Sequence, residues 1–189
     1  PMKCPPDGLP ASNGAMTACM VGSVGAEVSS RVLVPDRLEA VVNALDDAKD
    51  ADLVLTSGGA SVGEHDLIKP ALERAGFTLD FWRVAIRPGK PLIVARRGSQ
   101  LMLGLPGNPV STFVTAVLFA LPALRRMAGS ERALPQPINL PLAGVLPAAG
   151  TRREFLRARL SPEGATPIDE RDSSALAALA RADVLIDRP

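Results

Sequence analysis

Two glycine-rich stretches of this sequence have the residue types and spacing of anion-binding turns. The first, SGGASVG at residues 57–63, follows an apolar run at 52–57 and comes shortly before Asp66. Glycines directly after a parallel strand let the backbone present successive N–H groups, and a helix that follows adds the positive end of its dipole. The alternative is an ordinary connection between a strand and a helix, with Asp66 as the N-cap. The pattern alone is compatible with both interpretations.

The second stretch, GLPGNPVS at residues 104–111, also follows an apolar run and precedes an apolar helix pattern. Pro109 suits the first position of that helix, Asn108 can donate or accept hydrogen bonds, and Ser111 would lie in the first turn. In open α/β sheets, ligands bind at the carboxyl ends of the strands. We therefore expect both glycine-rich stretches to face one crevice.

A cationic turn, RPGKP at residues 87–91, lies between these two stretches in the sequence. Arg87 offers a planar fork of donors and Lys90 a compact point charge, a combination that suits a phosphate or a tetrahedral oxyanion. By itself the turn would be an ordinary solvated loop. Together with the two glycine-rich turns, it predicts a single anion-binding crevice.

Asp36 and Asp66 each stand where a predicted strand gives way to a predicted helix. As a pair they could hold Mg²⁺, which prefers one or two carboxylates together with substrate oxygens. The alternative is that both are only N-caps, and Glu39 has the spacing that would complete a capping box with Asp36.

The composition narrows the possible chemistry. His65 is the only histidine, so a zinc centre or a Ser-His-Asp triad would depend on one side chain. Cys4 and Cys19 do not make a disulfide framework, which predicts a reducing, cytoplasmic location. The net charge of +1 argues against nucleic acid or a membrane surface as a partner. The longest apolar run, 110–124, is interrupted by polar and proline residues and predicts a buried helix rather than a membrane span.

The periodicity of the apolar residues predicts alternating helices and strands up to about residue 130. Helices are predicted over 12–24, 36–48, 66–76 and 109–127, and strands over 26–34, 52–57, 78–86, 91–95 and 101–105, the last two as a hairpin. This order predicts an α/β domain at 1–130, with a largely parallel sheet covered on both faces. The proline-rich remainder, 131–189, predicts a small all-β, barrel-like domain with strands near 154–160 and 182–187. Prolines at positions 1, 5, 6 and 10 cannot belong to a central strand, so we expect the first strand of the sheet to be missing.

Seven motifs, in order and with their spacing intact, resemble the molybdopterin molybdenumtransferase family, which includes the gephyrin E-domain. They are PASNG (10–14), VPD (34–36), SGGASVGEHD (57–66), RPGKP (87–91), GLPGNPVS (104–111), REFLRARL (153–160) and DSSALAALARAD (172–183). The resemblance implies a molybdopterin-binding α/β domain followed by a C-terminal β-barrel domain. It implies insertion of molybdate into adenylylated molybdopterin, with release of AMP and a requirement for Mg²⁺.

The resemblance also implies roles for individual residues. The molybdopterin phosphate would be bound by Ser57, Gly58, Gly59, Ser61, Gly63, Pro106, Gly107, Asn108 and Asn13. Molybdate would be bound by Arg87, Lys90 and Ser111, with one of Arg153 and Arg157 and one of Ser173 and Ser174. Asp66 would be the essential acid, Asp36 a second acid and metal ligand, and Lys90 a further catalytic group.

The sequence departs from the family pattern in two respects. Arg87 stands where family members usually carry lysine, which keeps the charge but changes its geometry. The upstream domains, whose residues help to complete the site across a homodimer interface in the family, are absent, so this chain alone is expected to bind weakly or to be inactive. The alternatives are a molybdopterin adenylyltransferase, which shares the α/β domain, and a non-catalytic scaffold of the same family.

Overall fold

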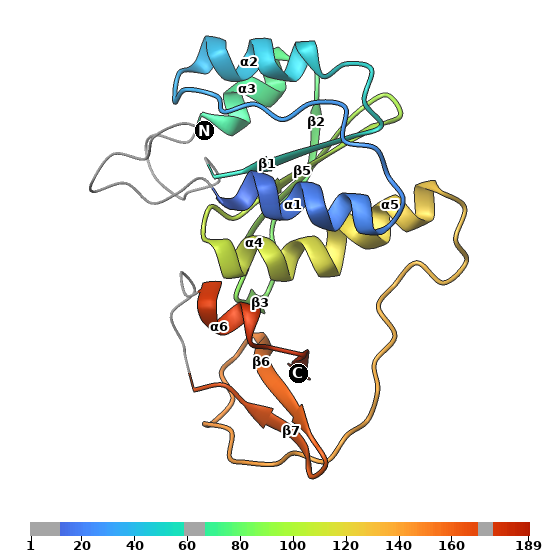
Figure 1. The fold of residues 1–189 in the computed structure, drawn as a ribbon. Coiled ribbons are helices and arrows are strands. Elements are labelled where there is room, and N and C mark those ends of the chain that lie inside the picture. The colour runs from blue at the N-terminus through green and yellow to red at the C-terminus, as the bar shows by residue number, and fades with distance from the viewer. Residues whose placement is uncertain (1–11, 59–66, 170–175) are drawn as a thin grey trace.

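The computed structural model describes residues 12–58, 67–169 and 176–189 of the chain (Figure 1). Its helices are α1 (Ser12–Ser23), α2 (Leu38–Asp47), α3 (Ile68–Arg74), α4 (Pro109–Thr115), the π-helical turn η1 (Ala116–Ala120), α5 (Leu121–Met127) and α6 (Leu176–Ala180). Its strands are β1 (Leu53–Ser57), β2 (Thr78–Arg83), β3 (Ile86–Arg87), β4 (Pro91–Arg97), β5 (Gln100–Leu105), β6 (Arg153–Ser161), β7 (Gly164–Pro167) and β8 (Val184–Arg188).

The first sheet has the strand order β1-β5-β4-β2, and the predicted α/β class is confirmed. β1 runs parallel to β5, whereas β5 with β4 and β4 with β2 are antiparallel. The described sheet is therefore mixed rather than mostly parallel. The reason is the predicted hairpin over 91–105, which forms with Gly98 at a φ of +59°. Two strands joined by so short a turn must run in opposite directions.

Helices cover both faces of this sheet. Successive side chains of a strand point to opposite faces, and here both sets are apolar and need to be covered. Ile93, Ala95 and Met102 pack with α2 and α3 on one face. Leu92, Val94, Leu103 and Leu105 pack against η1 and residues of α1 on the other. Figure 1 shows the resulting three layers, with α2 and α3 above the sheet and α1, α4 and α5 below it.

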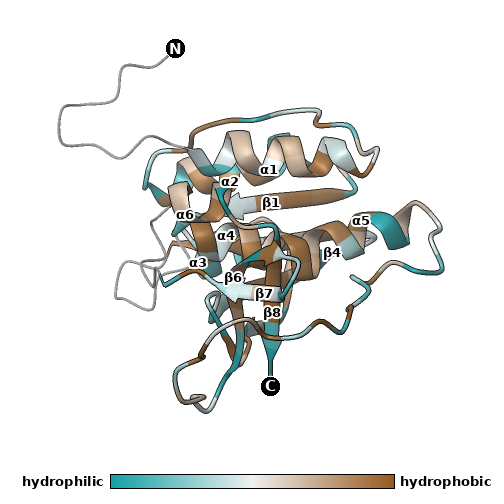
Figure 2. Ribbon diagram, turned by 60° about the horizontal axis from the view of Figure 1, so that its bottom comes forward, coloured by the Kyte–Doolittle hydropathy of each residue, from teal (hydrophilic) through white to brown (hydrophobic). Residues whose placement is uncertain are grey.

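The long helix on the lower face is continuous from Pro109 to Met127, through α4, η1 and α5. By length and composition alone it could cross a membrane, but half of that stretch is buried within the protein. The π-helical turn ends two residues before Pro122, whose missing N–H cannot continue the regular hydrogen-bond ladder. The helix ends on Arg125 and Arg126, the hydrophilic tip of α5 in Figure 2.

The predicted glycine stop of α3 is confirmed in detail. Gly76 has a φ of +78°, its N–H bonds the carbonyl of Glu73, and the N–H of Phe77 bonds that of Leu72. These two bonds are those of a Schellman motif, which requires a left-handed residue at this position.

The predicted strand over 26–34 is wrong. These residues form an exposed extended segment, with Val32 66% and Leu33 62% exposed. No described residue makes a backbone hydrogen bond to residues 26–34. β-branched side chains favour a strand only where a neighbouring strand and a packed face exist, so the local pattern could not decide the outcome.

The predicted capping box at Asp36 is also wrong. The N-cap of α2 is Arg37, with no side-chain cap bond, and Asp36 lies exposed one residue earlier. Glu39 instead accepts hydrogen bonds of 2.5 and 3.0 Å from Arg74 of α3. The ion pair between α2 and α3 thus uses the carboxylate that a capping box would need. Likewise, α3 has Leu67 rather than Asp66 as its N-cap.

The second sheet has the order β3-β6-β7, with β8 paired to the other side of β6. It lies below α4 in Figure 1, and the prediction of a β-rich C-terminal part is confirmed. Residues 78–86, predicted as one strand, divide between the two sheets, because Ile86 and Arg87 of β3 pair in parallel with Arg153 and Glu154 of β6. The division of domains at residue 130 stays a prediction.

Candidate anion-binding site at the strand ends

The two glycine-rich turns leave the same edge of the sheet. β1 and β5 are parallel neighbours, with Ser57 opposite Leu105 in the register. The N–H of Gly58 also bonds the carbonyl of Leu105, at 3.3 Å. Both turns therefore begin at the carboxyl ends of adjacent strands, which is where open α/β sheets bind ligands.

Glycine at two positions lets these turns touch. A Cβ atom at Gly107 would lie 3.2 Å from the Cα of Gly58, closer than ordinary van der Waals contact. Gly58 itself has a φ of +93°, a conformation that residues with a side chain rarely adopt. The close approach of the two backbones keeps side chains away from the point where the two turns meet.

Asn13, near the start of α1, holds the two turns together. Its Nδ2 donates to the hydroxyl oxygen of Ser57 and to the carbonyl of Gly107, both at 2.7 Å. The Ser57 hydroxyl in turn lies 3.5 Å from the carbonyl of Pro106. One amide group thus ties together three segments that are distant in the sequence.

Two buried acceptors beside these turns have no hydrogen-bond partner among the described residues. They are the Oδ1 atoms of Asn13 and Asn108. Asn108 is the N-cap of α4 but makes no side-chain cap bond. An unpaired buried carbonyl is costly, so both atoms fit a ligand that brings N–H or O–H donors.

Thr112 is a supporting residue that the sequence analysis did not identify. Its fully buried hydroxyl donates to the carbonyls of Pro106 and Asn108, at 2.5 and 2.9 Å. These bonds anchor the second glycine-rich turn to the first helical turn of α4. The signal was present in the sequence, because a threonine four residues after an N-cap can bond back to that carbonyl.

The cationic turn packs against the same helix. A Cβ atom at Gly89 would lie 2.6 Å from Cγ2 of Thr115, and the turn is closed by a 3.1 Å bond from the Val84 N–H to the Lys90 carbonyl. Ile86 packs against Val110 and Val114 of α4. At 1.5 Å rise per residue, Thr115 lies about 10 Å along the axis from Asn108. Gly58, the second glycine-rich turn and the cationic turn therefore lie beside the first two turns of one helix.

The predicted oxyanion ligands differ in their surroundings. The Arg87 side chain is 57% exposed, and its Nη1 lies 3.5 Å from Oε1 of Glu154. Lys90 is exposed and makes no ion pair with the part of the chain that the structure describes. Ser111 is buried one helical turn before Thr115, on the helix that the cationic turn contacts.

Arg153 and Arg157 lie on the same face of β6, as their spacing of four requires. Arg153 is occupied by Asp187, which accepts bonds of 2.7 and 2.5 Å from Nε and Nη2. These bonds lower the pKa of the Asp187 carboxyl and raise the pKa of Arg153. Arg157 is buried and already has a partner. Neither guanidinium is therefore as open to a small anion as Arg87.

Several predicted site residues lie outside the described residues, namely Gly59, Ser61, Gly63, Asp66, Ser173 and Ser174. Among the described residues, no group of three or more His, Cys, Asp or Glu side chains is placed to hold a metal ion. Asp36 is exposed on the bend before α2.

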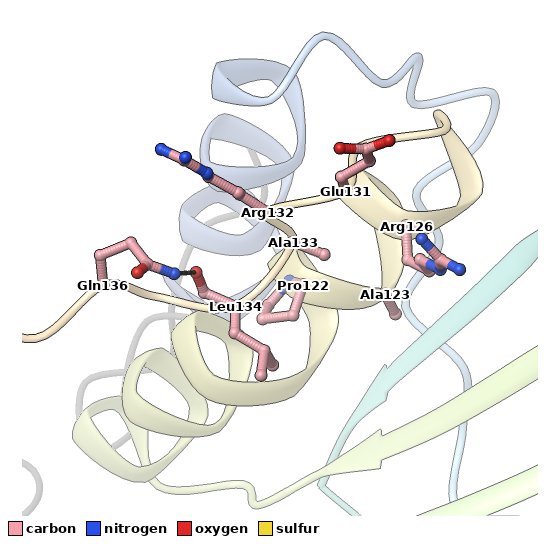
Figure 3. Close-up of a pocket in the computed structure, with 8 residues that line it drawn as sticks. All are labelled: Pro122, Ala123, Arg126, Glu131, Arg132, Ala133, Leu134 and Gln136. Carbon is pink, nitrogen blue, oxygen red and sulfur yellow. Dashed lines mark hydrogen bonds between the residues drawn. The ribbon is translucent and has the colours of Figure 1, made fainter.

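A hollow in the described structure lies away from these turns. It has a volume of about 500 Å³ and lies between α5 and residues 131–136, as Figure 3 shows. Pro122 in its wall is fourteen residues beyond Asn108, or about 21 Å along the helix. Arg126 and Glu131 lie on its rim, and the Gln136 amide there bonds the Leu134 carbonyl at 3.1 Å. The hollow is thus separate from the strand-end turns.

Comparisons with known proteins agree with this architecture. A family described as "probable molybdopterin binding domain" matches residues 6–126, and one described as "MoeA C-terminal region (domain IV)" matches residues 139–189. A MoeA molybdopterin biosynthesis protein of Pyrococcus horikoshii has a similar structure, with a TM-score of 0.82 and 27% identity over 100% of this chain and 46% of that one.

Curated relatives carry related names. A "Molybdopterin molybdenumtransferase" of Synechococcus elongatus is 40% identical over 156 residues, covering 80% of this chain and 38% of the relative. The "Molybdenum cofactor synthesis protein cinnamon" of Drosophila melanogaster is 42% identical over 144 residues, covering 73% and 24%. The chain therefore spans less than half the length of these two relatives.

The fold and the paired turns at its strand ends define an α/β ligand-binding domain of the molybdopterin-binding type. With the MoeA-type region that follows it, the chain belongs to the molybdopterin molybdenumtransferase family.

Proposed function

We propose that this chain forms the substrate site of a molybdopterin molybdenumtransferase, in which molybdate is inserted into adenylylated molybdopterin and AMP is released. One observation carries the proposal. Asn13 joins the turns after β1 and β5, and the cationic turn at 87–91 packs on the helix that begins at the second of them. This arrangement supports a site in which backbone groups of the two turns, and the cations of the turn at 87–91, would bind one anionic ligand near the start of α4.

Molybdopterin would be bound at the glycine-rich turns. Its phosphate would be bound by other backbone N–H groups of these turns, since the N–H of Gly58 bonds the Leu105 carbonyl, and the contact between Gly58 and Gly107 keeps side chains away. A phosphate cannot satisfy the buried Oδ1 atoms of Asn13 and Asn108, because they are acceptors. The amino and ring N–H groups of a pterin are donors and could do so. The site thus has partners for both ends of such a ligand.

Molybdate would be bound by Arg87, Lys90 and Ser111. It carries two negative charges and four acceptor oxygens, so two cations and a hydroxyl group can hold it without redox chemistry. The reaction then depends mainly on positioning and charge neutralisation, which agrees with a chain that contains only one histidine. Arg157 or Arg153, and Ser173 or Ser174, remain proposed additions from the C-terminal part.

Asp66 is proposed as the essential acid, and Asp36 with Asp66 as ligands of Mg²⁺. The cation would neutralise phosphate oxygens when it is bound. Asp66→Ala in the full-length enzyme should leave folding intact and abolish molybdate insertion, and unchanged turnover would remove Asp66 from the active site. The homodimer and the cytoplasmic location also stay predictions.

The β-rich part favours this function over that of an adenylyltransferase, because residues 139–189 match the MoeA C-terminal region. An assay for AMP transfer from ATP separates the two. Nothing in the described residues favours a scaffold role.

The central test compares two lysines by calorimetric titration of the full-length enzyme with molybdate and, separately, with molybdopterin. Lys90→Ala should weaken molybdate binding by about tenfold, the loss of roughly one charge-assisted contact, and change molybdopterin binding much less. Lys69→Ala is the matched control, because Lys69 lies on α3 with its Nζ 3.4 Å from the centre of the Trp82 ring. An equal loss for both ligands in Lys90→Ala would place Lys90 on the phosphate instead.

A further inference from the structure

A buried carboxylate on β6 lies between two arginines, one of them a proposed molybdate ligand. Glu154 is only 5% exposed. Its Oε2 accepts a hydrogen bond from Nη2 of Arg188, and its Oε1 lies 3.5 Å from Nη1 of Arg87. Each carboxylate oxygen thus faces a different guanidinium.

The contact with Arg188 fixes Glu154 from the last strand of the chain. The Arg188 side chain is only 16% exposed, and its Nη1 also donates to the Pro147 carbonyl at 2.5 Å. Separation of a buried ion pair would leave an uncompensated charge on each partner. The pair therefore stays together, and each side chain limits the conformations of the other. Glu154 is therefore a rigid group rather than a mobile surface carboxylate.

The contact with Arg87 follows from the pairing of strands. Arg87 of β3 lies opposite Glu154 of β6 in their parallel register. Arg87 is mostly exposed and meets Glu154 at a longer distance than a normal hydrogen bond. It therefore keeps donors for an anion while its direction is restricted by the carboxylate.

We infer that Glu154 is a positioning residue of the proposed oxyanion site, which holds the Arg87 guanidinium in the orientation that binds molybdate. This inference depends on the proposed function. It gives the β-rich part a defined contribution to that site, through β6 and β8, without a direct contact to the anion.

Charge and positioning predict opposite results when Glu154 is neutralised. Glu154→Gln removes a negative charge from the surroundings of Arg87, so Coulomb attraction alone would strengthen molybdate binding. Loss of the carboxylate would instead free the Arg87 side chain, which then loses conformational entropy when it binds the anion. We expect molybdate affinity to fall about fivefold, with molybdopterin binding unchanged.

A double-mutant cycle tests whether the effect acts through Arg87. Molybdate affinity is measured calorimetrically on the full-length enzyme, its Glu154→Gln and Arg87→Ala variants and the double variant, with thermal unfolding recorded for each. Glu154→Gln should have no further effect once Arg87 is alanine. Asp80→Asn, which neutralises the carboxylate partner of Arg96 on the other sheet, is the control and should leave affinity unchanged.

The outcomes separate the inference from the proposed function. Tighter or unchanged molybdate binding in Glu154→Gln, or an equal loss in both Arg87 backgrounds, would overturn the positioning role alone. Absence of molybdate binding by the full-length wild-type enzyme would overturn the proposed oxyanion site and the inference with it. If Glu154→Gln does not fold, Glu154→Gln combined with Arg188→Met removes both charges of the buried pair and takes its place in the cycle.

Discussion

The side-chain nitrogen of Asn13 lies 2.7 Å from the hydroxyl oxygen of Ser57, although the two residues are 44 positions apart. The same nitrogen donates to the Gly107 carbonyl. A residue at the start of α1 therefore determines how closely the turns after β1 and β5 approach. Any ligand that uses both turns depends on this amide.

Asn13→Asp should weaken the site through both geometry and charge. A carboxylate cannot donate to Ser57 or Gly107, and it brings a negative charge beside two acceptors. We expect a loss of about 1–2 kcal/mol in the free energy of unfolding, since two modest hydrogen bonds disappear. Phosphate-bearing ligands should bind at least tenfold more weakly. Chemical denaturation and calorimetric titration measure the two effects, and tighter phosphate binding in Asn13→Asp would contradict the assignment.

Gly107→Ala should reduce ligand binding more than it reduces stability. The added Cβ would lie 3.2 Å from the Gly58 Cα, so one turn must move by a few tenths of an ångström. The expected cost is about 1 kcal/mol in stability, at the lower end for overpacking. Gly22→Ala is the control, because its Cβ would meet no atom within 4 Å and alanine favours a helix by about 0.5–1 kcal/mol. Full binding by Gly107→Ala would show that contact between the turns is dispensable.

Gly89→Ala should strongly destabilise the cationic turn. Gly89 has a φ of +114°, and an added Cβ would overlap Cγ2 of Thr115 at 2.6 Å. We expect a loss of about 2–4 kcal/mol, from overpacking together with backbone strain. Thr115→Ser removes Cγ2 but keeps the hydroxyl that bonds the Ser111 carbonyl at 2.7 Å. The double variant should therefore recover part of the loss, and no recovery would mean that the clash with Thr115 is not responsible, which leaves backbone strain and the 3.1 Å approach to Ile86 Cδ1.

The ion pair between Arg153 and Asp187 should make stability depend on pH in acid. Hydrogen bonds from Arg153 lower the pKa of the Asp187 carboxyl in the folded protein. The stabilisation is therefore fully present above the unfolded pKa of about 3.9, and is lost as the pH falls through the lower folded pKa. Asp187→Asn should be less stable than wild type at neutral pH and should converge with it in strong acid. Denaturation at a series of pH values measures this difference.

Asp50→Asn is a suitable control for that series, because Asp50 is exposed and makes no ion pair with a described residue. Its stability should differ from wild type by a small amount that does not follow the Asp187 profile. A constant difference between wild type and Asp187→Asn at every pH would show that the pair does not titrate as proposed.

Local chain chemistry made much of the fold predictable. Gly76 as a helix stop, Pro109 at the first position of α4 and the hairpin over 91–105 all depend on neighbouring residues, and all three are confirmed. The failures occurred where a distant partner decides. Residues 26–34 have strand-forming side chains but no described strand beside them, and Glu39 pairs with Arg74 instead of capping its own helix.

The candidate site was likewise predictable from the sequence only in part. Its glycines, cations and amides could be selected from the sequence, because each type of residue suits anion binding by its own chemistry. Their convergence could not, since it depends on β1 and β5 being neighbours and on Gly89 packing against Thr115. The sequence by itself determined which groups are available and where the turns begin. Only the tertiary structure decided that Asn13 joins the two turns, that Asp187 occupies Arg153, and that Glu154 faces Arg87, because hydrogen bonds and ion pairs require atoms within a few ångströms and chain order does not specify that distance.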